Sequence, residues 1–375
     1  MTGHPSDTYF SVAGKYAKRT GLFLKENVSI REKMFSYGLL SLVYFNFSLI
    51  CSILYEGWNE SNGINDVIPT LGYLNVIPRT AIIRFHKLKL VKTLRMLDEV
   101  NICNSDRRRQ FKAVIETYMK WVFQITCSLA LSVVVVGTIT WYFTRLTPLP
   151  FGIMPKWALN YSFTSCLIIQ LITFPFIAHE YVMIDCLKVG ILIQLQMHFK
   201  NLRLDILNLL SCCTEDGVDS WEYLQNEVKK VNIYWDTLKD ICTKIEDVFN
   251  LCVFSTVINY SLYLCCTYLG MSHIPLYGAE FWLIIFYLFA SSFMFVADCW
   301  FTQRVITESD QVASSCYDVD FVGTDLKFQK ALMLMIGKAK RPVRFTIGKF
   351  APFCIVTLVV IAKVSFSYVT FLENI

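Results

Sequence analysis

The last part of the chain reads KFAPFCIVTLVVIAKVSFSYVTFLENI (residues 349–375). At about 1.5 Å per residue, a helix over residues 349–372 is long enough to cross a hydrocarbon core. Its residues are not uniformly apolar. A rotation of about 100° per residue places a set of polar side chains on one face: Lys363, Ser367, Thr370 and Asn374. Because polar groups are costly in lipid, this polar stripe should face either a water-filled pore or the seam with a neighbouring helix.

The rest of the chain also has the composition of a membrane protein. Of its 375 residues, 54% are hydrophobic and 17% are charged, unlike an ordinary soluble domain. Six further stretches approach or exceed the roughly 20 residues that a spanning helix needs: residues 34–55, 67–85, 118–143, 159–184, 248–270 and 281–301. The second contains Pro69, Pro78 and Arg79, so we expect a kinked span. The predicted fold is therefore an all-α, seven-transmembrane helical membrane protein.

Basic residues are distributed unevenly between the two sides of the predicted bundle. They are frequent before the first span and in the links that follow the second, fourth and sixth spans. The loops 56–66 and 271–280 contain no Lys or Arg, and the loop 144–158 contains only Arg145 and Lys156. Since basic loops stay in the cytoplasm, we predict a cytoplasmic amino terminus and an extracellular carboxy terminus, in a multi-pass protein of the plasma membrane. This inverted topology is the reverse of that of a G-protein-coupled receptor.

The spans divide the chain into six predicted segments. They are a cytoplasmic amino-terminal segment (1–33), spans one to four (34–184), a cytoplasmic helical extension (185–247), spans five and six (248–301), a cytoplasmic loop and helix (302–348), and the last span (349–375). Apolar residues recur near helical spacing in the extension, including Val231, Trp235, Leu238, Ile241, Cys242 and Ile245. These apolar faces are expected to pack either on each other or on the same region of neighbouring subunits.

Few residues indicate a catalytic, metal-binding or modification site. Asn59 begins a glycosylation tripeptide in the first predicted extracellular loop. His179 and Glu180 lie in the inner part of span four, Asp185 lies at its inner end, and Asp298 lies in span six. We interpret these four residues as buried partners rather than a catalytic site. No nucleophile motif, phosphate-binding loop or zinc spacing accompanies them, so we expect no enzyme activity, metal, cofactor or nucleic-acid partner. The 14 cysteines fall mostly in spans or cytoplasmic segments and should be free thiols.

Several motifs in the last third of the chain resemble the carboxy-terminal signature of insect odorant receptors. They are ITESDQVA (306–313), Tyr317, KAKRP (338–342), FTIGKF (345–350) and IAKVSFSYVTFL (361–372). Two positions depart from the family pattern, with Lys340 where Gln is usual and Phe321 where Trp is usual. The rest of the chain resembles the family in length, number of spans and inverted topology. The related gustatory receptors end in a Thr-Tyr…Gln-Phe pattern, which Ser367-Tyr368 and Glu373-Asn374 do not complete.

The resemblance implies a subunit of a ligand-gated, non-selective cation channel. In such channels four subunits meet through a cytoplasmic anchor built from the inner ends of spans four to seven, and the last helix of each subunit lines the pore. A receptor of this kind pairs with a shared co-receptor, Orco, in a heterotetramer surrounded by membrane lipid in the dendrites of sensory neurons. The resemblance places the gate at Thr370, Phe371 and Asn374, with Lys363 and Ser367 along the pore. Lys363 would repel cations unless it pairs with a carboxylate or points between subunits.

The resemblance also places an odorant pocket in the outer half of the helix bundle of one subunit. The candidate ligand-binding residues lie at a consistent depth in spans two, three and six: Tyr73, Gly137, Thr138, Trp141, Tyr142, Trp282, Phe286 and Tyr287. Such a pocket suits a small neutral volatile, and stacking on the aromatic residues favours an aromatic one. Alternatively, these aromatic side chains belong to the core or to a belt at the membrane interface.

Three other functional classes compete with this interpretation. A gustatory-type ligand-gated channel is the nearest alternative. A G-protein-coupled receptor is disfavoured by the charge bias. A transporter is disfavoured because the sequence shows no internal repeat.

Overall fold

The computed structural model describes residues 30–56, 64–100, 105–144, 149–151, 154–210, 221–273 and 278–373. Its elements are α3 (Ile30–Glu56), α4 (Ile64–Phe85), α5 (Lys87–Glu99), α6 (Ser105–Thr144), α7 (Lys156–Tyr161), α8 (Phe163–Leu207), α10 (Trp221–His273), α11 (Ala279–Tyr317), α12 (Leu326–Ala339), β1 (Thr346–Ile347), β2 (Ala351–Pro352) and α13 (Ile355–Glu373). The predicted all-α fold is confirmed, with one small hairpin added. The expectations for Asn59 and Asn374 lie outside the described residues.

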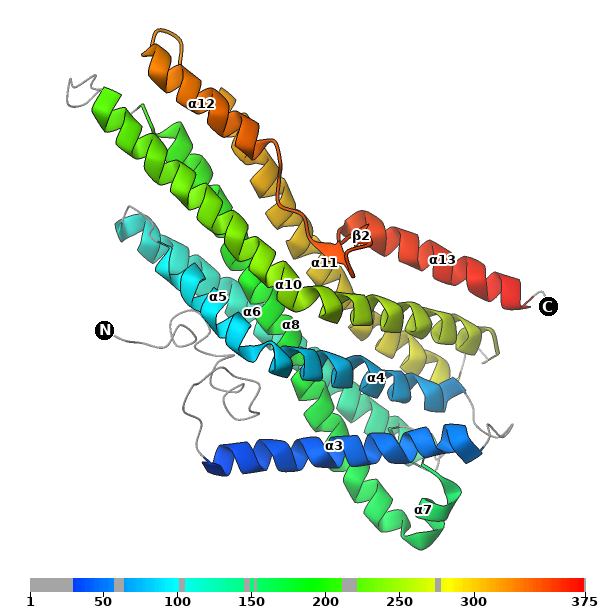
Figure 1. Cartoon of the computed structure of the whole chain (residues 1–375). Helices are drawn as coiled ribbons and strands as arrows, with labels where there is room; N and C mark the ends of the chain where they lie inside the picture. Colours follow the sequence, from blue (N-terminus) through cyan, green and yellow to red (C-terminus); the bar gives the residue numbers. More distant parts are fainter. Residues whose placement is uncertain are drawn as a thin grey trace.

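Each of the seven predicted spans lies largely on one of these helices. Within the described residues, four helices are long and apolar enough to cross a membrane: Ala113–Thr144, Phe163–Leu207, Leu224–Met271 and Phe281–Tyr317. Tyr37–Cys51 and Ile355–Phe371 are shorter apolar helices. The remaining predicted span is α4, whose helix continues through Pro69 and Pro78. In Figure 1, α3, α4, the second half of α10 and α13 run in similar directions, as neighbouring spans would.

The fourth predicted span begins later in the chain than expected. Residues 159–161 belong to the short helix α7, and α8 begins at Phe163. Ser162 separates the two helices with an extended backbone, and its Oγ accepts a hydrogen bond from the Ser165 N–H at 3.3 Å. A serine in this position caps a helix by satisfying one of its first free N–H groups. The cap therefore sets the start of α8.

The last span also begins later, at Ile355 rather than at residue 349. The residues before it form a hairpin in which Thr346 pairs with Pro352 and Ile347 with Ala351. At the turn, Gly348 and Lys349 have φ angles of 57° and 65°. This left-handed backbone conformation suits glycine and cannot continue a right-handed helix. The hairpin therefore joins α12 to α13 as a separate element.

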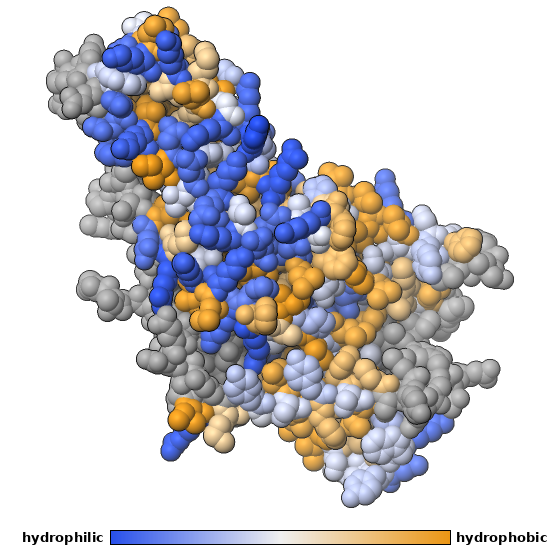
Figure 2. Space-filling model, viewed as in Figure 1, coloured by the Kyte–Doolittle hydropathy of each residue, from blue (hydrophilic) through white to orange (hydrophobic). Residues whose placement is uncertain are grey.

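Four of the described helices, α6, α8, α10 and α11, are much longer than a hydrocarbon core is thick, with 40, 45, 53 and 39 residues. α10 has 53 residues, or about 80 Å of helix, whereas a hydrocarbon core is about 30 Å thick. The second halves of α8 and α11, the first half of α10, and α12 together form an arm that projects from the bundle (Figure 1). Figure 2 shows hydrophilic residues over much of the visible face of this arm, and more hydrophobic residues over α13 and the lower bundle.

The apolar faces predicted for the cytoplasmic extension (residues 185–247) are buried within the arm. All six predicted residues, Val231, Trp235, Leu238, Ile241, Cys242 and Ile245, are buried. The Trp235 ring lies 5.8 Å from that of Phe199 on α8. Burial raises the pKa of the Cys316 thiol, at the end of α11, to about 11, so this thiol stays protonated. These apolar faces therefore pack against other helices of the same chain.

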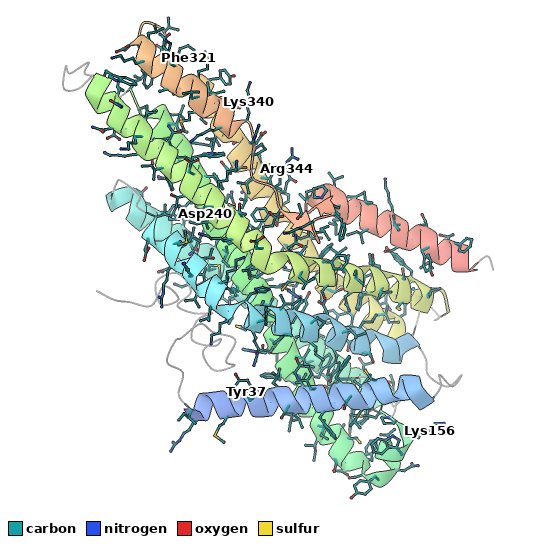
Figure 3. The ribbon with its side chains drawn as sticks, in the orientation of Figure 1. Tyr37, Lys156, Asp240, Phe321, Lys340 and Arg344 are labelled. Atoms are coloured by element: carbon teal, nitrogen blue, oxygen red, sulfur yellow. The ribbon has the colours of Figure 1, made fainter. Side chains whose placement is uncertain are left out.

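The two ends of the molecule carry the basic residues that define the predicted topology. Lys340 and Arg344, predicted to be cytoplasmic, lie at the arm and in the linker after α12, beside the part of α10 that carries Asp240 (Figure 3). Lys156, predicted to be extracellular, lies at the opposite end, at the start of α7 (Figure 3). The two groups thus lie at opposite ends of the molecule, and the inverted orientation in the membrane stays a prediction.

Candidate ligand cavity and pore helix

A cavity of about 170 Å³ lies inside the bundle, between α4, α6, α8, α10 and α11. Its walls are mainly apolar and aromatic. They consist of Gly72, Asn75, Val76, Thr126, Leu129, Ala130, Val133, Phe174, Ile177, Ala178, Tyr181, Val182, Thr256, Asn259, Tyr260, Tyr263, Tyr287, Ala290, Ser291, Met294 and Phe295. A small apolar cavity with a few polar groups is the usual form of a site for a small molecule.

Tyr287 is the one predicted ligand residue that lines this cavity. Its hydroxyl group lies against Gly137: a Cβ added at Gly137 would overlap the Tyr287 Oη and would come within 3.0 Å of the Phe151 ring. A larger residue at position 137 would therefore force the end of the Tyr287 side chain to move. On α6 the cavity is lined by residues 126–133, so Gly137 lies beside one end of the cavity and about one turn beyond it.

Tyr73 lies behind the cavity wall rather than in it. Its side chain is fully buried. Its hydroxyl accepts a hydrogen bond from the Asn46 Nδ2 at 2.9 Å and lies 3.3 Å from the Thr173 Oγ1. The same Asn46 nitrogen donates to the Thr173 Oγ1 at 2.9 Å. This network ties α3, α4 and α8 together, and Tyr73 reaches the cavity only through Phe174, whose ring lies 6.1 Å from its own.

The other five predicted ligand residues also lie outside the cavity lining. Tyr142 and Trp282 are 61% and 62% exposed, which suits the interfacial belt alternative. Thr138 donates its hydroxyl to the Val134 carbonyl oxygen at 2.8 Å, within α6. Trp141 and Phe286 are half-buried. The cavity therefore lies deeper in the bundle than the pocket predicted from the sequence.

Phe151 packs behind Phe174, a residue of the cavity wall, and sequence reasoning did not identify it. It lies in the segment between α6 and α7 and is fully buried. Its N–H donates to the Gln170 Oε1 at 3.1 Å. Its ring stacks on that of Phe174 at 4.0 Å, with an interplanar angle of 6°. A phenylalanine in a loop gives no signal of such a role in the sequence, because only the fold brings it onto α8.

A cluster of four buried charges lies beside the cavity. The Arg79 guanidinium is 5.1 Å from the centre of the ring of Tyr181, a wall residue. Arg79 forms an ion pair with Asp185, and Lys188 forms one with Asp298; the Lys188 Nζ is also 3.4 Å from the Asp185 Oδ1. The cluster thus contains two positive and two negative groups, whose charges offset one another. The interpretation of Asp185 and Asp298 as buried partners is confirmed.

His179 and Glu180 are not part of this cluster. Glu180 is buried and His179 is half-buried, both on α8. Among the residues that the structure describes, no group of three or more His, Cys, Asp or Glu side chains could hold a metal ion.

An aromatic contact joins the cavity to the hairpin before α13. Phe295 lines the cavity and stacks on Tyr260, with ring centres 4.5 Å apart. On its other side, the Phe295 ring lies 6.2 Å from that of Phe353. Phe353 is buried, and its N–H donates to the Phe345 carbonyl oxygen at 2.8 Å, across the hairpin. A change in the position of Phe295 can therefore reach the start of α13 through one side-chain contact.

The hairpin itself is attached to α10. The Asn250 Nδ2 donates to the Thr346 Oγ1 at 2.8 Å and to the Thr346 carbonyl oxygen at 3.1 Å. The Thr346 hydroxyl donates to the Glu246 Oε1 at 2.5 Å. These bonds hold one side of the hairpin, whereas Phe350 at its tip is 86% exposed.

α13 packs on the rest of the chain along one narrow face. That face is formed by Ile361, Ser365 and Val369, which are buried, and it contacts α10, where the Cys265 thiol lies 3.8 Å from the Ser365 carbonyl oxygen. The described stripe residues, Lys363, Ser367 and Thr370, are all exposed. At about 100° per residue they lie on the opposite side of the helix. Among the described residues, therefore, the polar stripe forms no seam with another helix of the same chain.

The other residues around the stripe are exposed and apolar. They include Val356, Val359, Val360, Val364, Phe366, Tyr368 and Phe371. Lys363 forms no ion pair with any residue that the structure describes. Most of the surface of α13 is thus left for lipid, water or other subunits to cover.

Comparison with known proteins places the chain among odorant receptors. The family model described as 7tm Odorant receptor matches residues 64–366. Odorant receptor 85d of Drosophila melanogaster is 22% identical over 232 residues, which cover 62% of this chain and 55% of that protein. Odorant receptor 10 of Aedes albopictus is 23% identical over 163 residues, or 43% of each chain. The chain thus aligns with about half of the length of these relatives.

Solved structures show the same fold. The insect olfactory receptor OR5 from Machilis hrabei matches with a TM-score of 0.81 and 14% sequence identity, over 97% of each chain. The structure of the same receptor in complex with eugenol matches with a TM-score of 0.79 and 12% identity, over 98% of this chain and all of that one.

Proposed function

Because the chain belongs to the 7tm odorant receptor family, we propose that it is the odorant-sensing subunit of a ligand-gated, non-selective cation channel. The observation that carries this proposal is the apolar cavity, joined through Phe295 and Phe353 to a helix whose polar face has no partner in the described part of its own chain. A cavity without such a connection would suit a simple binding protein. The connection to α13 is what favours a gated pore.

The proposed ligand is a small neutral volatile with an aromatic ring. An apolar cavity of about 150 Å³ in another protein holds benzene, so the 170 Å³ here suits one ring with small substituents. The walls offer aromatic faces for stacking, including Phe174, Tyr181 and Phe295. The similar receptor OR5 was solved in complex with eugenol, and we propose a ligand of comparable kind for this chain.

The proposed gating step moves α13. Odorant in the cavity would stabilise one position of Phe295, and thereby of Phe353 and the hairpin, in which α13 lies farther from the pore axis. Such a population shift requires only that the odorant bind the open arrangement more tightly than the closed one. Ser367, Thr370, Phe371 and Asn374 are the proposed pore and gate residues.

The proposed assembly is a heterotetramer with the shared co-receptor Orco, in the plasma membrane of sensory dendrites. The exposed apolar surface of α13 and the exposed residues Val322, Leu326, Met333 and Leu334 at and before α12 are the surfaces that other subunits would cover. In that assembly Lys363 is proposed to point toward a neighbouring subunit, where a carboxylate can neutralise it.

Recording currents from cells that express the chain with and without an insect co-receptor tests the proposal. A panel of small volatiles is applied, and surface expression is measured in parallel. We expect fast cation currents only in the cells that express both proteins. Current from the chain alone would contradict the need for a co-receptor. Silence in both, with the chain and the co-receptor at the surface, would contradict the proposed function.

A further inference from the structure

One amide side chain in the cavity wall has no hydrogen-bond partner in the part of the chain that the structure describes. Asn75 lies on α4 and lines the cavity. Its Oδ1 is buried and accepts no hydrogen bond from any described residue. Within the same residues, its Nδ2 donates none either. The carboxamide of Asn75 therefore has a buried oxygen with no partner and a nitrogen that donates to no described residue, beside a mainly apolar space.

Five other polar side chains of the wall have hydrogen-bond partners within the protein. The hydroxyls of Thr126, Thr256 and Ser291 donate to carbonyl oxygens in their own helices, at 2.8, 2.8 and 3.1 Å. The Asn259 Nδ2 donates to the Leu71 carbonyl oxygen at 3.0 Å, and the Tyr260 hydroxyl lies 2.9 Å from the Ser292 Oγ. Asn75 differs from all of these.

Tyr287 is a second candidate for a polar contact, because its hydroxyl lies beside Gly137 at one end of the cavity. Unlike the Oδ1 of Asn75, however, the Tyr287 hydroxyl is not a buried atom without a partner, so it loses less than the carboxamide does. An unsatisfied buried amide is costly because it has given up its bonds to water without replacing them. The cavity therefore favours an occupant that supplies a hydrogen bond at Asn75.

We propose that Asn75 is the polar anchor of the odorant site and that it tunes this receptor to small monocyclic volatiles that carry a hydroxyl group. A hydroxyl can donate to the Oδ1 of Asn75 and accept from its Nδ2, so one group satisfies both ends. A hydrocarbon of the same shape leaves them unsatisfied and binds more weakly. This inference rests on the proposed function, because it takes the cavity as the odorant site.

A matched pair of probes tests the proposal in cells that express the chain with the co-receptor. 4-Methylphenol and 1,4-dimethylbenzene have nearly the same shape and differ by a hydroxyl in place of a methyl group. We expect the phenol to activate the wild-type channel at a concentration roughly tenfold to a hundredfold lower than the hydrocarbon, the ratio that one satisfied buried polar group supplies. Asn75→Leu, which keeps the volume, should reduce this ratio to near one by weakening the response to the phenol.

Two further variants test whether the ratio depends on Asn75 itself. Tyr287→Phe removes the second hydroxyl and should preserve most of the ratio. Asn232→Leu makes the same change on the arm, where the Asn232 Nδ2 donates to the Val228 carbonyl oxygen, and should leave the ratio unchanged. If Asn75→Leu does not reach the surface, Asn75→Ser provides the test, because it keeps a hydroxyl and should keep a ratio above one but below that of the wild type.

The outcomes distinguish this inference from the proposed function. Equal sensitivity to the two probes in the wild type would overturn the role of Asn75 while leaving the odorant-gated channel intact. The same holds if other volatiles open the channel and neither probe does, or if Tyr287→Phe abolishes the ratio and Asn75→Leu does not. A channel that no volatile opens would overturn both.

Discussion

α8 and α13 are both largely apolar helices, but they differ in how many of their side chains the rest of the chain buries. Every side chain from residue 182 to residue 195 of α8 is buried. On α13, only Ile361, Ser365 and Val369 are buried among the described residues. The inner half of α8 is surrounded by α4, α6, α10 and α11, whereas α13 touches the chain along one side. The comparison separates a buried centre from a helix with few contacts to the rest of its own chain, and weakly packed elements are those that shift most readily.

The difference also explains where charges are tolerated. Asp185 and Lys188 on α8 are fully enclosed, and each has a partner of opposite charge. Lys363 on α13 is exposed, and no described residue pairs with it. A buried charge needs a partner of opposite charge. An exposed charge can instead be solvated by water, including water in a pore, or pair with a neighbouring subunit.

The largest expected effect comes from breaking the buried charges of α8. Asp185→Asn removes the carboxylate that Arg79 and Lys188 share, and leaving a buried charge without its partner costs about 3–5 kcal/mol. We expect little protein at the cell surface and a clearly lower melting temperature in detergent. Asp247→Asn provides the control, because Asp247 and its partner Lys89 are both more than 40% exposed and such pairs contribute at most about 1 kcal/mol. Equal melting temperatures for the two variants would contradict the account of α8.

A smaller effect is expected from weakening the contact between the cavity and α13. Phe353→Leu shortens the side chain that meets Phe295, while leaving the cavity walls unchanged. We expect normal surface expression and a several-fold smaller maximal current for the same odorant. Phe350→Leu makes the same change at the exposed tip of the hairpin and should leave the current near the wild-type level. A normal maximal current in Phe353→Leu would show that the gating movement does not pass through this contact.

Gly137→Ala should change odorant sensitivity without affecting assembly. The added methyl group would displace the Tyr287 hydroxyl and press on Phe151, so the end of the cavity must rearrange. We expect the half-maximal concentration to shift by about tenfold, equivalent to about 1.4 kcal/mol. Gly38→Ala on α3 is the matched control, since nothing lies within 4 Å of the added atom. Similar dose–response curves for the two variants would argue against a ligand next to Tyr287.

The smallest effect is expected at Trp282. Its side chain is mostly exposed and lies outside the cavity lining, as a residue of an interfacial belt would. Trp282→Ala should shift the half-maximal odorant concentration by less than about twofold, because it removes no contact with the ligand. A shift as large as that of Gly137→Ala would instead return the site to the outer pocket predicted from the sequence.

The helices and the polar stripe could be predicted from the sequence because both depend on local periodicity. The stripe at Lys363, Ser367 and Thr370 follows from spacing alone, and the structure leaves it exposed. Asp185 and Asp298 were recognisable because charges in apolar spans need partners. Their partner Lys188 lies in the segment predicted to be a cytoplasmic extension (185–247), because the sequence does not show how far α8 continues as a buried helix.

The cavity was harder to predict because it is a gap left by five helices. Its position depends on how Phe174, Tyr181 and Phe295 meet across the bundle, and no local pattern encodes that. Phe151 reaches the site from a loop. Tyr73 was predicted as a ligand residue and Asn75 was not. The one signal for Asn75 in the sequence is a carboxamide in the middle of an apolar span.

The most direct test of the account is whether the stripe of α13 lines a conducting pathway. Ser367→Cys places a thiol on the stripe, and Val364→Cys places one on an exposed apolar surface about a quarter of a turn from the centre of the stripe. Each variant is expressed with the co-receptor, opened by an odorant and exposed to a positively charged, membrane-impermeant methanethiosulfonate reagent, with the wild type as control for the native cysteines. We predict that the current through Ser367→Cys is blocked and that the currents through Val364→Cys and the wild type persist. Persistent current through Ser367→Cys, with block of Val364→Cys, would contradict a pore lined by this face of α13.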